Sequence, residues 1–155
     1  MAVNIKHNAL PALVLDTNAA LDGLVFDNPG IRTLMAGLRA GTLRWLATPA
    51  MRLEFARVLR RPLLGKHVCD GEHALSQFDA LAILCVETIH LLAPKLLCRD
   101  ADDQRFIDLA LRERVGWLVT RDRDLLCLAS RARRLQLAIV TPEAAAAAVS
   151  SAPYP

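Results

Sequence analysis

The stretch PALVLDTN (Pro11 to Asn18) is a short apolar run that ends abruptly at an acid. Four consecutive apolar residues, 12–15, predict a strand that is buried on both faces, because a half-buried strand would alternate apolar and polar side chains. Such strands are typical of parallel sheets. We therefore expect Asp16 to lie at the carboxyl edge of a parallel sheet, where α/β proteins bind their ligands.

Strands and helices are predicted to alternate along the rest of the chain. Further strands are expected at RWLATP (44–49), around 88–92, at 117–120 and at QLAIVTP (136–142). Helices are expected at 31–38, 50–62, 75–86, 106–115 and 130–135, and after Thr141-Pro142-Glu143, which has the composition of a helix start. This order predicts a three-layer α/β/α sandwich with a central parallel sheet of four or five strands.

The composition is that of one soluble globular domain. The chain has 155 residues, of which 54% are hydrophobic and 23% charged, enough to bury a sizeable core. We expect a single domain over 1–149 and a disordered tail over 150–155. No apolar run approaches the roughly 20 residues that span a bilayer, and the N-terminus lacks a signal-peptide pattern. These observations predict a cytoplasmic protein that does not enter a membrane.

The cysteines and the basic residues are less informative. The four cysteines are widely spaced without a CxxC pair, so neither a disulfide framework nor a zinc site is expected. The net charge is +3, and sixteen of the nineteen basic residues are arginine. Arginine binds phosphate through a planar fork, which suits nucleic acid. A GC-rich coding sequence would produce the same bias.

Acidic residues gather where the predicted sheet should have its site. They are Asp16 after the first strand, Asp122 and Asp124 after the strand at 117–120, Asp100, Asp102 and Asp103 before the helix leading into that strand, and Glu54 at the border of a helical apolar face. Each has a structural alternative: Asp102 can cap its helix, and Glu54 can pair with Arg57 or Arg61. Their coincidence at one edge is harder to explain structurally.

Converging carboxylates repel one another, and a divalent cation removes that conflict. Hard oxygen ligands select Mg²⁺ or Mn²⁺ over softer metals. Such an ion activates water and offsets charge on a leaving oxygen, which is the chemistry of phosphodiester hydrolysis. No GxxxxGK[ST] or GxGxxG loop is present, so a nucleotide cofactor is not expected.

Four motifs in order resemble the PIN-domain nuclease family: LVLDTN, TPAMRLEFARVLRRP, RDADDQRFIDLA and LVTRDRDLL, spread over residues 12–142. The chain is most similar to the subgroup related to VapC-type toxins of toxin–antitoxin pairs. The resemblance implies a Mg²⁺- or Mn²⁺-dependent endoribonuclease acting on RNA. A small antitoxin protein and a homodimer are implied as partners.

The resemblance also implies roles for individual residues. The catalytic acids would be Asp16, Glu54, Asp103 and Asp122, with Asp16, Asp103 and Asp122 binding metal. Asn18, Thr120 and Asp124 would support them, and Arg57, Arg60, Arg61, Arg121 and Arg123 are candidates for RNA binding. Asp103 is preferred to Asp102 as the metal-facing acid because it precedes Phe106 and Ile107 by three and four residues, on the inward side of the helix. Asp102 is then expected to be the cap.

Two other functions remain open. The same scaffold could be a binding module without turnover, held in complex with an antitoxin. A phosphatase or receiver-like domain would also place an aspartate at a strand end. That reading is disfavoured because the first strand ends in DTN, not DxD, and the three lysines (Lys6, Lys66 and Lys95) lie away from the late strand ends.

Overall fold

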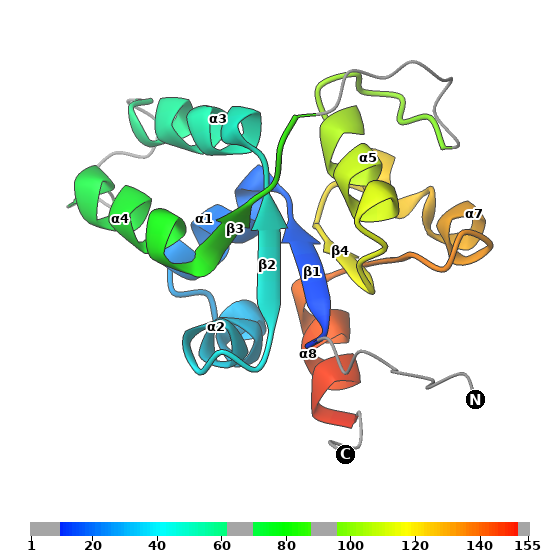
Figure 1. Cartoon of the computed structure of the whole chain (residues 1–155), viewed down its shortest axis with the longest axis horizontal. Helices are drawn as coiled ribbons and strands as arrows, with labels where there is room; N and C mark the ends of the chain where they lie inside the picture. The colour runs from blue at the N-terminus through cyan, green and yellow to red at the C-terminus, as the bar shows by residue number, and fades with distance from the viewer. Residues whose placement is uncertain (1–9, 62–69, 88–95, 152–155) are drawn as a thin grey trace, which may run out of the picture.

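Five parallel strands form one sheet in residues 10–61, 70–87 and 96–151, which are the residues that this computed structural model describes. The strands are β1 (Ala12–Leu15), β2 (Arg44–Ala47), β3 (Ala82–Leu84), β4 (Trp117–Val119) and β5 (Ala138–Val140). Their order is β3-β2-β1-β4-β5, and every neighbouring pair is parallel (Figure 1). The predicted parallel sheet flanked by helices is confirmed.

The strand order places a topological switch point between β1 and β4. From β1 the chain moves outward to β2 and β3 and then crosses back to β4 on the other side of β1. β1 is buried along its whole length, as its apolar sequence predicts. The loops after β1 and β4 therefore leave the sheet side by side at its carboxyl edge, which is where parallel sheets form their sites.

Helices flank this sheet. They are α1 (Thr17–Leu24), α2 (Arg32–Arg39) after the 3-10 turn η1 (Pro29–Ile31), α3 (Pro49–Leu59), α4 (Gly71–Leu81), α5 (Gln104–Arg112), α6 (Arg123–Leu126), α7 (Ala129–Arg133) and α8 (Pro142–Ser151). In Figure 1 α3 and α4 lie on the β2–β3 side of the molecule, and α5 and α7 lie on the β4 side. α5 packs on β1 and β4, and α8 packs against η1, α2 and β4.

An aromatic cluster joins α3 and α4 to the sheet. The ring of Phe78 in α4 meets Trp45 of β2 edge to face at 4.5 Å between centroids and Phe55 of α3 at 5.1 Å. All three rings are almost fully buried. Because buried aromatic rings bring both area and preferred geometry, this cluster fixes α3, and with it Glu54, relative to the sheet.

The strand at the sheet edge differs from the prediction. The expected helix 75–86 is wrong in its second half, because α4 ends at Leu81 and the chain continues as β3. Cys85 N donates to Ala47 O at 2.7 Å, so pairing with β2 overrides the helical propensity of this Ala- and Leu-rich run. The strand expected at 88–92 lies outside the described residues.

Two helices were not predicted, and one extends further than expected. Residues 17–18 begin α1, and the polar turn after β4 contains the four-residue helix α6. α8 begins after Thr141, whose hydroxyl accepts from Ala144 N at 3.4 Å, as the sequence predicts. This helix runs on to Ser151, so Ser150 and Ser151 belong to it and not to a tail.

Candidate functional site

Four acids from four different segments line one cavity of about 210 Å³. Asp16 follows β1, Glu54 lies in α3, Asp103 precedes α5 and Asp122 precedes α6. Thr17, Asn18, Val58, Arg61 and Phe106 complete the lining. The structure thus places the four predicted catalytic acids around one small cavity at the carboxyl edge of β1 and β4.

Asp16 is the most tightly held of the four acids. Its backbone N–H donates to Val119 O at 3.1 Å, and its Oδ1 accepts from Ala19 N at 2.7 Å, which caps α1. Its Oδ2 accepts from the Thr120 hydroxyl. Burial raises the pKa of Asp16 to about 6, with smaller contributions from the charges of Asp122 and Asp22, although the hydrogen bonds from Thr120 and Ala19 oppose this rise.

Thr120 links Asp16 to Asp122. Its side chain is fully buried, and its hydroxyl, which donates to Asp16, also accepts from Asp122 N at 2.9 Å. Asp122 Oδ1 in turn accepts from Asp124 N at 2.7 Å and Leu125 N at 3.4 Å, capping α6. One hydroxyl therefore sets the positions of two acids from neighbouring strands.

Asp103 faces the cavity from the start of α5, and Asp102 does not. Burial, together with smaller contributions from the charges of Asp122, Asp100, Asp16 and Glu54, raises the pKa of Asp103 to about 6. The predicted cap at Asp102 is wrong: α5 begins at Gln104, Asp103 occupies the cap position without a side-chain hydrogen bond, and the Asp102 side chain is 88% exposed. Asp100 Oδ1 instead accepts from Asp102 N at 2.9 Å, which shapes the loop.

Gln104 holds the segment that leads to Asp103. Its Oε1 accepts from Cys98 N at 2.7 Å, and its Nε2 donates to Leu96 O and to Asp108 Oδ1, both at 2.8 Å. A glutamate at this position could not donate either bond and would place a second carboxylate beside Asp108. The sequence alone predicts no role for Gln104, because the backbone groups that its amide binds come close only when the loop is folded.

Glu54 has an ionic partner that the sequence analysis did not identify. Its Oε2 lies 3.3 Å from Arg105 Nη1, although the buried oxygen has no hydrogen-bond partner among the described residues. The contact is an ion pair without good hydrogen-bond geometry. The sequence suggested Arg57 or Arg61 as the structural partner of Glu54, whereas the structure pairs it with Arg105 of α5. The two residues are 51 positions apart, so helical spacing could not reveal the pair.

The candidate RNA-binding arginines occupy different environments. Arg61 lines the acidic cavity, while Arg57, Arg60 and Arg123 are exposed and are not part of its lining. Asn18 lines the cavity with an exposed side chain, and Asp124 stands outside it, with its backbone N–H capped by Asp122.

Arg121 is held by two acids. Its Nε donates to Asp22 Oδ2 at 3.0 Å, and its Nη2 donates to Glu143 Oε1 at 2.6 Å. The same hydrogen bond holds the pKa of Glu143 below its usual value. Gly30 of η1 lies directly beneath this pair, where a β-carbon would collide with the Glu143 carboxylate. An arginine engaged in this way is less suited to bind phosphate than Arg61.

The donor set fits a hard divalent cation held partly by water or substrate. The cavity offers carboxylate oxygens, which Mg²⁺ and Mn²⁺ prefer. In the described part of the chain no three His, Cys, Asp or Glu side chains form a compact group that could hold a metal ion by themselves. Mg²⁺ usually takes one or two carboxylates together with waters and phosphate oxygens, so a complete protein cage is not required.

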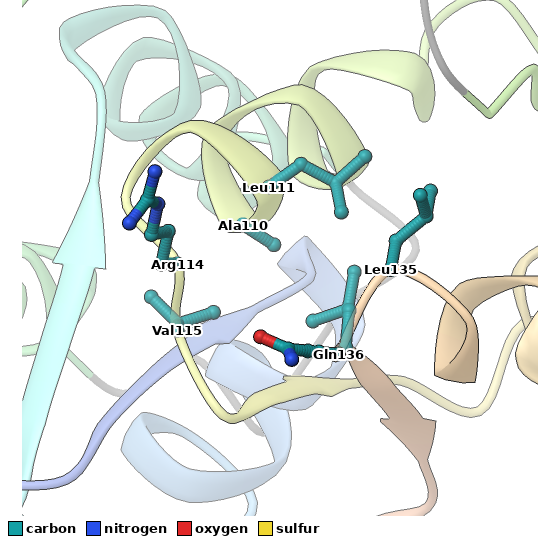
Figure 2. Close-up of a pocket in the computed structure, with 7 residues that line it drawn as sticks. Ala110, Leu111, Arg114, Val115, Leu135 and Gln136 are labelled. Atoms are coloured by element: carbon teal, nitrogen blue, oxygen red, sulfur yellow. The ribbon is translucent and has the colours of Figure 1, made fainter.

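A larger cavity lies at the other end of the strands and lacks acids. It has a volume of about 370 Å³ and is lined by Ala110 and Leu111 of α5, by Arg114 and Val115 after that helix, and by residues 135–137 before β5 (Figure 2). Of the seven described residues that line it, five have aliphatic side chains and none is acidic. Its greater size therefore does not make it the better candidate for phosphodiester chemistry.

A comparison with known protein families identifies the segment that carries these acids. A family model described as a PIN domain matches residues 12–124, a segment that contains all four acids of the cavity. A search of curated proteins gives no match. Among the described residues, no helix is long and apolar enough to cross a membrane.

The raised pKa of Asp16 predicts that the acid destabilises the metal-free protein at neutral pH. An aspartate with a folded-state pKa of about 6 and a usual value of 3.8 adds stability below the lower value, and this stability is lost as the pH rises through about 6. Asp16→Asn should therefore raise the free energy of unfolding by about 1–2 kcal/mol at pH 7.5, since asparagine still caps α1.

Denaturant unfolding in EDTA at pH 7.5 and pH 4.5 tests this expectation. The difference in the free energy of unfolding between Asp16→Asn and wild type should shrink at pH 4.5, where the wild-type carboxyl of Asp16 is protonated. Asp27→Asn, which alters an exposed acid paired with Arg32, serves as the matched control and should change stability little. A variant less stable than wild type at pH 7.5 would contradict the argument.

Proposed function

The chain belongs to the PIN-domain family, and we propose that it is a Mg²⁺- or Mn²⁺-dependent endoribonuclease that hydrolyses phosphodiester bonds in RNA. The observation that carries this proposal is the convergence of four carboxylates on one cavity at the switch point of the sheet. Two of them, Asp16 and Asp103, have a pKa raised to about 6. Perturbed acids that share a cleft at the expected edge are typical of functional sites.

In this proposal Asp16, Asp103 and Asp122 hold the metal. The ion, when bound, lowers the pKa of a water and offsets charge on the phosphate. Thr120 keeps Asp16 and Asp122 at fixed positions, and Gln104 fixes the approach to Asp103. Protons compete with metal for Asp16 and Asp103 below a pH of about 6, so these two carboxylates are best prepared to bind metal at neutral or higher pH. Glu54 adds the fourth negative charge from α3.

Arg61 is the basic residue that we propose to hold the RNA phosphate. Among the described residues that line the cavity it is the one cation, and no described acid forms an ion pair with it. A guanidinium beside the acids can donate two parallel hydrogen bonds to a pair of phosphate oxygens while the carboxylates face the scissile bond. Asn18, which lines the cavity, and Asp124, whose backbone N–H donates to Asp122 Oδ1, are the proposed supporting residues.

Asp103→Asn should abolish metal-dependent cleavage, because the substitution removes a ligand charge and leaves the loop intact. We expect wild type to cleave single-stranded RNA with Mn²⁺ and not with EDTA, and the variant to lose at least a hundredfold in rate. The measurement is the cleavage of labelled RNA resolved on a gel, with Asp27→Asn as the control that keeps wild-type activity. Equal cleavage in EDTA, or full activity of Asp103→Asn, would refute the proposal.

The same assay separates the enzyme from the alternative, a module that binds RNA or protein without turnover. RNA bound by wild type in Mn²⁺ and recovered uncut would favour the module.

Arg61→Gln should weaken substrate binding more than the chemical step. Loss of a phosphate contact is expected to raise KM about five- to tenfold, with a smaller change in kcat. Initial rates in Mn²⁺ measure both constants. Arg114→Gln is the matched control, since it removes the same charge from the cavity at the other end of the strands. If the two substitutions raise KM equally, RNA binding depends on the net charge of the protein and not on the position of Arg61.

The motif resemblance extends the proposal to a toxin of a toxin–antitoxin pair. An antitoxin segment carrying an arginine would pair naturally with the four carboxylates. Induced expression of the chain alone in a bacterial host should then arrest growth, and Asp103→Asn should not. Optical density and colony counts after induction measure this. If the wild-type protein cleaves RNA in vitro but its expression does not slow growth, the protein is a nuclease without a toxin role.

A further inference from the structure

Arg105 is a cation placed at the rim of the acidic cavity, and neither the proposed metal ligands nor the proposed phosphate contact account for it. Its Nη1 lies 3.3 Å from Glu54 Oε2, and the two side chains are 33% and 31% exposed. Asp16 and Asp122 receive hydrogen bonds from neutral hydroxyl and amide groups. Glu54 is thus the acid of this cavity for which the described residues supply a positive partner.

The position of Arg105 is fixed by the loop that carries Asp103. Its Nε donates to Asp102 O at 2.8 Å, and its Nη2 lies 3.8 Å from Asp102 Oδ1. The guanidinium is therefore anchored to the Asp102 carbonyl, three residues earlier in the chain, and extends from α5 to Glu54 in α3. These contacts hold the positive charge of Arg105 next to Glu54, one of the acids that line the cavity.

The pair itself is incomplete. Glu54 Oε2 is buried and has no hydrogen-bond partner among the described residues, although the Arg105 cation is near. A buried carboxylate oxygen without a hydrogen bond is costly, and it gains by exchanging a loose ionic contact for a closer cation. The arrangement compensates the charge of Glu54 and leaves the oxygen free to change partner.

We propose that Arg105 is a built-in counter-ion that offsets the charge of Glu54 and competes for this charge with a divalent cation held by Asp16, Asp103 and Asp122. This inference rests on the proposed metal-dependent function and deepens it, because it names a positioning residue that limits metal affinity. With Arg105 in place, the negative charge of Glu54 is already partly compensated, and the metal ion also meets repulsion from the guanidinium. Removing the cation should therefore tighten metal binding.

Mn²⁺ affinity measured without RNA tests the inference. At pH 7.5, calorimetric titration should show that Arg105→Gln binds Mn²⁺ about fivefold more tightly than wild type, the size expected for one positive charge roughly 8 Å from a divalent ion in a solvated cleft. Arg105→Lys keeps the charge and should bind Mn²⁺ with close to wild-type affinity. Arg112→Gln is the matched control, because Arg112 pairs with Glu113 at 2.8 Å at the other end of α5. This control should bind Mn²⁺ as wild type does.

A Glu54→Gln background separates competition for Glu54 from simple repulsion. In that background Arg105→Gln should tighten Mn²⁺ binding clearly less than it does in wild type. An equal gain in both backgrounds would overturn the competition, as would unchanged or weaker Mn²⁺ binding by Arg105→Gln. Thermal unfolding in EDTA verifies that each variant is folded.

The outcomes also distinguish this inference from the proposed function. Wild type that binds Mn²⁺ without a change in Arg105→Gln overturns the inference alone. Absence of Mn²⁺ binding in every variant, wild type included, overturns the metal-dependent function and the inference together.

Discussion

The register between β1 and β4 is the constraint on which the acidic cavity depends. Leu13 pairs with Trp117, Val14 with Leu118 and Leu15 with Val119, so the residues that follow, Asp16 and Thr120, emerge together. Asp16 N continues the pairing by donating to Val119 O. A slip of one residue would turn alternate side chains to the opposite face of the sheet and separate the carboxylate from the hydroxyl that holds it. Continuous apolar burial on both faces makes such a slip costly.

The fold class was predictable from the sequence because its strongest signals are local. Short apolar runs followed by acids indicated β1 and β4, an apolar helical face indicated α3, and the Thr-Pro-Glu start indicated α8. The edge strand β3 was not predictable, because its sequence continues the Ala- and Leu-rich composition of α4. Only the hydrogen bonds that β2 offers decide where helix gives way to strand, and a partner 37 residues earlier in the chain leaves no local trace.

The acids of the site were predictable from the sequence, but several of the residues that hold them were not. The four acids could be found because carboxylates after parallel strands must meet at one edge, and helical spacing favoured Asp103 over Asp102 as the inward acid. The roles of Arg105, Gln104 and Arg121 could not be found, because each depends on a partner from another segment. The same limitation explains the incorrect cap: Asp102 has the right residue type, yet the loop turns around Asp100 and the helix starts one residue later than the pattern suggests.

The hydrogen bond from Arg121 to Glu143 shows that the folding unit extends beyond the segment that carries the motifs. The family match ends at residue 124, but Arg121, next to Asp122, is held by the first turn of α8, and β4 needs β5 as its outer neighbour. Gly30 must lack a side chain for the Glu143 carboxylate to reach that position. The structural unit that holds Arg121 beside Asp122 therefore includes the alanine-rich C-terminal helix α8, which lies beyond the matched segment.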